Sequence, residues 1–147
     1  MASHSLLLCF DDELAIARQV ADAAGIELAV IERHHFPDGE LKLRLPERLS
    51  GSVTLLRSLD RPNEKLVELL LSAQTARQLG AARLTLIAPY LAYMRQDMAF
   101  RPGEAVSQTI VGRFLASLFD AVITVDPHLH RVATLEQAVP VPQAVVL

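Results

Sequence analysis

The sequence has very little cysteine, no tryptophan and no excess of basic residues, and these shortages exclude several classes of protein. Cys9 is the single cysteine among 147 residues, so an internal disulfide and a cysteine-rich zinc site are both excluded. A lone thiol in an apolar strand is typical of a buried, unreactive side chain, and a reducing cytoplasm is the expected location. The net charge of −3 gives no reason to expect a nucleic-acid partner.

Long hydrophobic runs are missing too. No apolar segment approaches the length of a membrane span, and the apolar run within residues 5–10 lacks the length and basic flank of a signal peptide. Apolar residues still make up 51% of the chain, which excludes a disordered polypeptide. We therefore expect residues 1–147 to form a single domain with a buried core that binds no membrane.

The familiar short motifs of nucleotide binding and covalent catalysis are absent. The sequence has no G-x-x-x-x-G-K-[ST] phosphate loop and no G-x-G-x-x-G turn. It also has no serine or cysteine in a recognisable nucleophile elbow. A nucleotide, if one binds, must therefore be held by other residues.

Short apolar runs alternate with amphipathic segments along the chain. Buried strands are expected over 5–10, 28–33, 52–58, 83–89 and 121–126, and residues 139–147 begin another. Residues 41–45 (LKLRL) alternate apolar and basic side chains, which predicts a half-exposed strand. The loops after 83–88 and 121–126 are polar.

Three helices are expected between these strands, each with an apolar stripe. The first is capped by Asp11 or Asp12 and ends at Gly25, and the second is capped by Asp60 or Asn63 and ends at Gly80. The third spans 104–119. The three stripes are Leu14, Ile16, Ala17, Val20, Ala21 and Ala24; Leu66, Leu69, Leu70, Ala73 and Ala76; and Val106, Ile110, Phe114 and Leu118.

The alternation of strands and helices predicts an α/β fold, with a mostly parallel sheet flanked by helices on both faces. Ligands of such sheets bind outside the carboxyl ends of the strands. The polar loops after 83–88 and 121–126 both fall at that edge, so we expect the functional residues there.

The first of these loops, residues 89–107, is unusually long and carries Arg95 and Gln96. The planar guanidinium of Arg95 matches phosphate oxygens, and the amide of Gln96 adds a donor and an acceptor. A surface turn in which Arg95 pairs with Asp97 is the alternative, because most surface ion pairs contribute little.

Two other stretches are candidates for a site. In VDPHLH, residues 125–130, Asp126 and His128 could reach one metal ion, and His130 could join them; a turn with exposed histidines is the alternative. In FPDGE, residues 36–40, Asp-Gly predicts a tight turn that needs no further role. Phe36 could instead stack on a base while Asp38 and Glu40 accept hydrogen bonds from its amine.

These stretches, in this order and spacing, resemble the N-terminal half of the ribose-phosphate pyrophosphokinases, also called phosphoribosyl pyrophosphate synthetases. The likeness runs through FPDGE, NEKLVELLLSAQTARQLGAARLTLIAPYLAYMRQD, PGEAVS and VITVDPHLH, nearly the whole chain. It implies the first of two phosphoribosyltransferase-like domains, with a small antiparallel flap. The implied reaction transfers the pyrophosphoryl group of Mg-ATP to the anomeric hydroxyl of ribose 5-phosphate, with release of AMP.

The resemblance also assigns roles to residues. It implies that Arg95 and Gln96 contact ATP and that His128 helps position Mg²⁺-bound ATP. Asp97 and Arg101 are further candidates for ATP binding, and Asp126 is a candidate metal ligand beside His128. The resemblance implies that the turn of Phe36, Asp38 and Glu40 holds the adenine of a neighbouring subunit, so a homo-oligomer with a shared pocket is expected.

Two departures from the family pattern stand out. Met98 follows Arg-Gln-Asp where many members have a basic residue, which favours the alternative of a regulatory or scaffold paralogue that binds nucleotide without turnover. A phosphoribosyltransferase that consumes the product is a weaker alternative. The ribose-5-phosphate loop, an acidic pair followed by Gly and Thr, has no counterpart, so the isolated chain is expected to be inactive.

Overall fold

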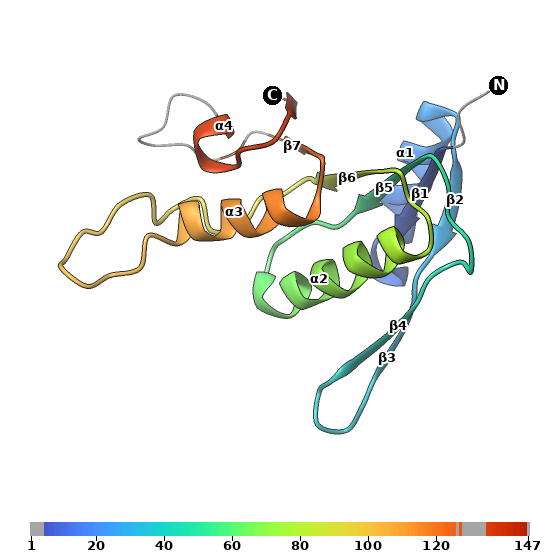
Figure 1. Ribbon diagram of the computed structural model, residues 1–147, viewed down its shortest axis with the longest axis horizontal. Helices are drawn as coiled ribbons and strands as arrows, with labels where there is room; N and C mark the ends of the chain where they lie inside the picture. Colours follow the sequence, from blue (N-terminus) through green and yellow to red (C-terminus); the bar gives the residue numbers. More distant parts are fainter. Residues whose placement is uncertain (1–4, 126, 128–134, 147) are drawn as a thin grey trace.

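The computed structural model of the chain describes residues 5–125, 127 and 135–146, and its centre is a six-stranded sheet (Figure 1). Every pairing in this sheet is parallel, which confirms the predicted fold class. The strand order is β2-β1-β5-β6-β7-β8. The strands are β1 (Ser5–Cys9), β2 (Glu27–Val30), β5 (Ser52–Leu56), β6 (Arg83–Ala88), β7 (Ala121–Val125) and β8 (Gln143–Val146).

Helices cover both faces of the sheet, because successive side chains of each buried strand point to opposite faces. Leu6 and Leu8 join the larger core with α2 and α3, whereas Leu7 and Cys9 join a smaller core with α1. The helical elements are η1 (Asp11–Glu13), α1 (Leu14–Ala24), α2 (Pro62–Gln78), α3 (Ser107–Leu118) and α4 (Leu135–Ala138). Within the described residues, none of the helices is both long and apolar enough to span a bilayer.

The strand expected over 28–33 is in fact two strands with different partners. β2 stays in the parallel sheet, Ile31 is buried, and the chain then leaves the sheet as β3 (Glu32–His35). β3 pairs with β4 (Leu41–Arg44) in an antiparallel hairpin that projects from the body (Figure 1). The break falls where apolar residues give way to polar ones, which a sheet covered on both faces does not bury. The predicted half-exposed strand at 41–45 is β4.

The predicted N-caps of the first two helices are wrong. Neither α1 nor α2 has a side-chain cap, and the residue before α2 is Arg61. Asp60 instead accepts a hydrogen bond from Lys65 Nζ at 2.9 Å, and Asp11 and Asp12 pair with arginines. These aspartates are used in ion pairs, and for that reason they do not cap. Gly25 does end α1, in the left-handed conformation with φ of 68°.

Four residues of the predicted apolar stripes are exposed, so those parts of the prediction are wrong. They are Ala24 and three large side chains, Ile16, Leu70 and Ile110, which are 43%, 38% and 57% exposed. Four residues exceed one 3.6-residue turn, so a line of residues spaced by four drifts around the helix. On α3 the buried face instead contains Gln108, Gly112 and Leu115.

Gly112 is the point of closest approach between α3 and α4. A Cβ atom at this position would lie 1.7 Å from the carbonyl oxygen of Ala138. That oxygen belongs to the backbone and has no flexible side chain that can move aside. Glycine is therefore required here by packing, although it weakens an isolated helix.

We predict that Gly112→Ala lowers stability by about 1–3 kcal/mol, because overpacking outweighs the gain in helix propensity. Chemical denaturation monitored by circular dichroism would measure this change. At a helix position without the α4 contact, the same substitution stabilises by about 0.5–1 kcal/mol. A stabilising effect of Gly112→Ala would therefore contradict the packing of α3 on α4.

Candidate functional site

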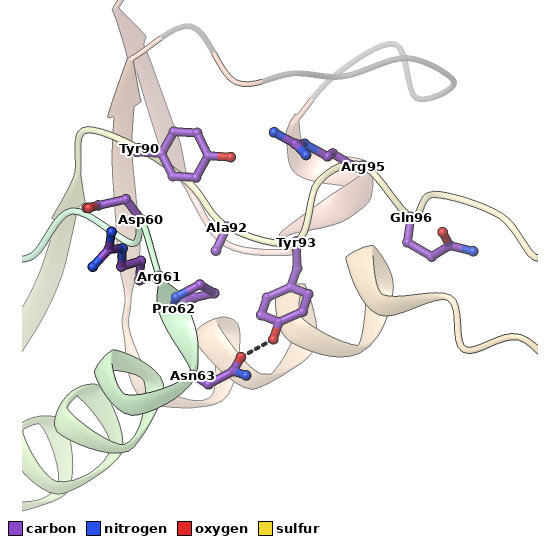
Figure 2. A pocket seen from close by; sticks show the side chains of 9 residues that line it. All are labelled: Asp60, Arg61, Pro62, Asn63, Tyr90, Ala92, Tyr93, Arg95 and Gln96. Carbon is purple, nitrogen blue, oxygen red and sulfur yellow. Dashed lines mark hydrogen bonds between the residues drawn. The ribbon is translucent and has the colours of Figure 1, made fainter.

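A pocket of about 430 Å³ opens at the carboxyl edge of the sheet, between the segments that follow β5 and β6. Figure 2 shows its two walls, one leading into α2 and the other following β6. The lining residues are Asp60, Arg61, Pro62 and Asn63 on the first wall, and Tyr90, Ala92, Tyr93, Arg95 and Gln96 on the second. The pocket lies at the edge where open parallel sheets bind their ligands.

Unusual backbone conformations shape both walls of the pocket. Within the described residues, Arg61 and Tyr93 are the two non-glycine residues with positive φ, at 49° and 64°. Such conformations cost about 1–3 kcal/mol each and persist where the surroundings hold them. The hydroxyl of Tyr93 donates to Oδ1 of Asn63 across the pocket (Figure 2), and the amide of Leu59 donates to the carbonyl of Tyr90 at 2.9 Å. The walls are thus tied together by the protein itself.

Arg95 lies at the rim of the pocket with an exposed side chain. Its guanidinium extends toward the side of Tyr90 (Figure 2). Among the ion pairs of the described residues, none involves this guanidinium, so this part of the structure gives no support to the alternative in which Arg95 pairs with Asp97. A guanidinium with no ion pair among the described residues can offer its planar fork of donors to an anionic ligand.

Gln108, which is fully buried at the start of α3, fixes the backbone on both sides of Arg95. Its side-chain Nε2 donates to the carbonyl oxygen of Met94 at 3.1 Å, and its backbone amide donates to that of Gln96 at 3.0 Å. The two hydrogen bonds hold the residues on either side of Arg95, so the backbone position from which the Arg95 side chain extends is fixed. Sequence reasoning missed Gln108, because a single polar residue in a helix is usually exposed.

The side chain of Gln96 bonds within its own loop. Its Nε2 donates to the carbonyl oxygen of Met98 at 2.8 Å and to Oε1 of Glu104 at 3.3 Å. The same carboxylate oxygen accepts from the backbone amides of Phe100 and Arg101 at 2.8 and 3.0 Å. Glu104 therefore organises the tip of the loop, a role that sequence reasoning missed. Asp97 and Arg101 belong to this loop but do not line the pocket.

The turn of Phe36, Asp38 and Glu40 is well formed but lies away from the pocket. The amide of Phe36 donates to the carbonyl of Glu40 at 2.8 Å, and Oδ1 of Asp38 accepts from the amide of Glu40 at 3.0 Å. Phe36 remains 41% exposed. The hairpin and the β6–α3 loop project from different parts of the molecule (Figure 1), so one chain does not bring these residues to Arg95.

The proposed metal and nucleotide residues Asp126 and His128, together with His130, lie outside the described residues. The chain enters this segment from β7, which ends at Val125 at the same edge of the sheet as the pocket. Within the described part, no group of three or more histidine, cysteine or acidic side chains is placed to hold a metal ion.

Charged side chains gather where the strand order reverses, between the carboxyl ends of β1 and β5. Arg57, only 2% exposed, bonds Oδ1 of Asp12 at 2.7 Å and Oε1 of Glu13 at 2.9 Å. Its Nε donates to Oε1 of Glu68 on α2 at 2.9 Å, and its guanidinium lies 4.7 Å from the ring centre of Phe10. Open sheets often bind ligands at such a reversal, and here ion-paired side chains line a pocket of about 280 Å³.

The pKa values around this cluster follow from burial and from the ion pairs. Burial works against the charged forms of Asp12 and Arg57, but their mutual hydrogen bond and charges prevail. The pKa of Asp12 is therefore lowered and that of Arg57 raised. Burial, together with the charges of Glu13 and Asp12, raises the pKa of the Cys9 thiol, which keeps it protonated and unreactive. The hydrogen bond from Lys65 lowers the pKa of Asp60.

Comparison with known proteins places these features in a family. Residues 6–118 match a sequence model of the N-terminal domain of ribose phosphate pyrophosphokinase. Curated proteins named ribose-phosphate pyrophosphokinase are similar to this chain. That of Methanopyrus kandleri is 39% identical over 132 residues, 89% of this chain and 45% of the relative. That of Saccharolobus solfataricus is 40% identical over 116 residues, 77% of this chain and 40% of the relative.

A solved structure shares the fold. The crystal structure of phosphoribosylpyrophosphate synthetase from Mycobacterium smegmatis matches with a TM-score of 0.82 at 24% identity, over 97% of this chain and 48% of that chain. The chain thus spans about half the length of the relatives that it matches. The family resemblance found in the sequence is confirmed.

We predict that Gln108→Met increases the rate of tryptic cleavage after Arg95 about threefold or more. The substitution removes the buried hydrogen bond to the Met94 carbonyl, which contributes about 1 kcal/mol, so the backbone around Arg95 opens more often. Methionine retains the length of the side chain and the backbone bond to Gln96. Limited proteolysis with mass spectrometry would give the rate. Ser72→Ala, at a buried serine on α2, is the control, and equal rates in both variants would contradict the bracketing role.

Proposed function

The chain belongs to the ribose-phosphate pyrophosphokinase family, and from this premise we propose that it forms the ATP-side half of an enzyme that makes phosphoribosyl pyrophosphate. The complete protein would transfer the pyrophosphoryl group of Mg-ATP to the anomeric hydroxyl of ribose 5-phosphate and release AMP. The observation that supports this role most directly is Arg95, exposed and without an ion-pair partner in the described part, at the rim of the pocket.

Transfer of a pyrophosphoryl group to a hydroxyl depends mainly on positioning and on neutralising phosphate charge. Arg95 supplies fixed positive charge and a fork of donors for the phosphates, and Gln108 keeps its backbone in place. Tyr90, 38% exposed on the same wall, offers an aromatic surface beside it. Gln96 can reach a phosphate only after it gives up its bonds to Met98 and Glu104.

Magnesium enters this proposal with the nucleotide. Asp126 supplies a hard carboxylate oxygen of the kind that Mg²⁺ prefers, and His128 suits a hydrogen bond to nucleotide or to metal-bound water. Two protein donors suit an ion whose remaining ligands are phosphate oxygens and water molecules. When bound, Mg²⁺ neutralises charge on the ATP phosphates.

The hairpin turn is proposed to complete the site of another subunit. Phe36 is exposed, the carboxylates of Asp38 and Glu40 are exposed beside it, and the turn lies away from the pocket of its own chain. This placement supports a homo-oligomer in which the turn of one chain covers the adenine bound near Arg95 of the next. We place the protein in the cytoplasm, where both substrates are available.

A nucleotide-binding paralogue without turnover is the second candidate, and the loop tip supports it. Met98, directly after Arg-Gln-Asp, is 39% exposed and stands where many members of the family carry a basic residue. The loop therefore has less positive charge beside Arg95 to attract phosphates, although Arg101 is exposed at its tip. Release of AMP by the full-length protein with ATP and ribose 5-phosphate would exclude this alternative, whereas ATP binding without AMP release would support it.

For the full-length protein, we predict that Arg95→Ala lowers kcat/KM for Mg-ATP by roughly 10- to 1000-fold, or about 1.5–4 kcal/mol, because a charge-assisted phosphate contact is lost. Steady-state kinetics would measure the effect, and circular dichroism would show that the variant folds. Arg113→Ala, an exposed arginine on α3, is the matched control. A change below threefold in Arg95→Ala would remove Arg95 from the site.

We also predict that mixing Arg95→Ala subunits with Phe36→Ala, Glu40→Ala subunits restores part of the activity that each variant has lost. Some interfaces in the mixture would pair an intact Arg95 pocket with an intact turn. Activity should be assayed after subunit exchange, with each variant alone as control. An absence of rescue in exchange-competent mixtures, or an ATP-binding monomer by light scattering, would contradict the shared site.

A further inference from the structure

Glu68 on α2 joins the hairpin to the body of the domain. It is 1% exposed, and its two carboxylate oxygens are held by different arginines. Oε1 accepts from Arg57 of the sheet, at 2.9 Å from Nε and 2.8 Å from Nη2. Oε2 accepts from Nη1 of Arg33, in the middle of β3. One buried carboxylate therefore links the sheet, the long helix and the hairpin.

Arg33 is held on its other sides as well. Its Nη2 lies 3.0 Å from Oδ1 of Asp11 and 3.8 Å from Oδ1 of Asp12, and its guanidinium lies 5.2 Å from the ring centre of Phe10. The side chain is only 17% exposed. A charged group with this many partners fixes the direction in which its strand leaves the domain.

The turn that carries Phe36 begins three positions beyond Arg33 in the chain. Two strands alone are marginally stable, and the bonds within a hairpin fix its internal geometry but not its angle to the body. His35 adds one more link, with Nε2 at 2.5 Å from Oε1 of Glu64 on α2, but both of these side chains are about half exposed. Arg33 is therefore the main polar attachment of the hairpin, beside the apolar contact that Leu43, its partner on β4, makes with the core.

We propose that Arg33, held by Glu68, is a positioning residue for nucleotide binding: it sets the angle of the β3–β4 hairpin and so places Phe36, Asp38 and Glu40 at the site of the neighbouring subunit. The proposal rests on the proposed function, since it assumes that this turn holds adenine. Arg33 itself contacts no nucleotide. It acts through the orientation of the hairpin of its own subunit. That hairpin completes the site that contains Arg95 of the neighbouring subunit.

The chain offers an informative variant and a matched control. Arg33→Met removes the charge and keeps an unbranched side chain, while Glu68 retains its bonds to Arg57, so no buried carboxylate loses its last partner. Arg33→Lys keeps the charge but loses the fork of donors. Arg44→Met removes an arginine from the same hairpin whose pairing to Glu32, at 3.8 Å, is largely exposed.

The kinetic test uses the full-length protein. Because the turn contacts the base and not the reacting phosphates, Arg33→Met should raise KM for ATP about 5- to 50-fold and leave kcat within about threefold. Arg33→Lys should give an intermediate value, and Arg44→Met should change KM less than about twofold. A fall in kcat with unchanged KM, or equal effects of Arg33→Met and Arg44→Met, would overturn the proposal.

A mixing experiment separates positioning from a general loss of stability. The mixtures are assayed at an ATP concentration well below the KM of the Arg33→Met protein, where that protein alone has little activity. Arg33→Met subunits should then restore activity to Arg95→Ala subunits, because the two defects affect opposite sides of the shared site. They should not restore activity to Phe36→Ala, Glu40→Ala subunits, because both defects then lie in the hairpin. Rescue of the hairpin variant by Arg33→Met would overturn the proposal.

A distance measurement tests the clamp without reference to activity. Spin labels would be attached at Pro37→Cys on the hairpin and Gln74→Cys on α2, two exposed positions. The other reactive cysteines of the protein would be replaced. Labelled subunits would be diluted with unlabelled subunits, so that distances within one subunit are measured. Pulsed electron paramagnetic resonance should show one narrow distance distribution, broadened by Arg33→Met and unchanged by Arg44→Met. An unchanged distribution in Arg33→Met would overturn the clamp. An inactive wild-type protein would instead refute the proposed function, and the distance result would still decide whether Arg33 orients the hairpin.

Discussion

The buried pairing of Arg57 with Glu68 is the interaction on which the arrangement of this domain depends. Both side chains are almost completely inaccessible to water, and removing one partner of such a pair typically costs about 3–5 kcal/mol. The pair connects the end of β5 to the middle of α2, so it fixes the helix on the sheet and the segment between them. That segment, Asp60–Asn63, is one wall of the pocket.

The same ion pairs set the chemistry of one of two places where a ligand could bind. In an open sheet the crevice is usually found where the strand order reverses, which here is between β1 and β5. Arg57 pairs there with Asp12 and Glu13, and the pocket of about 280 Å³ at this place is lined by ion-paired side chains. The pocket of about 430 Å³ lies one strand farther along, between the ends of β5 and β6, and has the exposed side chain of Arg95 at its rim. The two places at this edge of the sheet thus differ in how their charges are paired.

Sequence reasoning identified the sheet and the Arg95 loop because their signals are local. Strands buried on both faces appear as continuous apolar runs, and Arg95 and Gln96 are adjacent in a loop of unusual length. The ion-pair cluster could not be predicted, since Arg57 is 11 residues from Glu68 and 44 from Glu13, and their meeting depends on how the strands are ordered. Two features of the sequence point to buried charge at these positions. Arg57 directly follows an apolar strand, and Glu68 lies beside Leu69 in the apolar stripe of α2. The prediction of the helix N-caps was wrong for a related reason. The aspartates expected to cap the helices form ion pairs with arginine or lysine side chains instead.

The left-handed residues of the pocket have a consequence for how this protein can evolve. Glycine is the residue best suited to such backbone, yet Arg61 and Tyr93 occupy these positions and contribute their side chains to the pocket. Selection for heat resistance alone would favour glycine at both positions, at the expense of the pocket wall. Selection for binding would retain the strained residues and accept a less stable domain. These two positions are therefore where robustness and ligand affinity oppose each other in this chain.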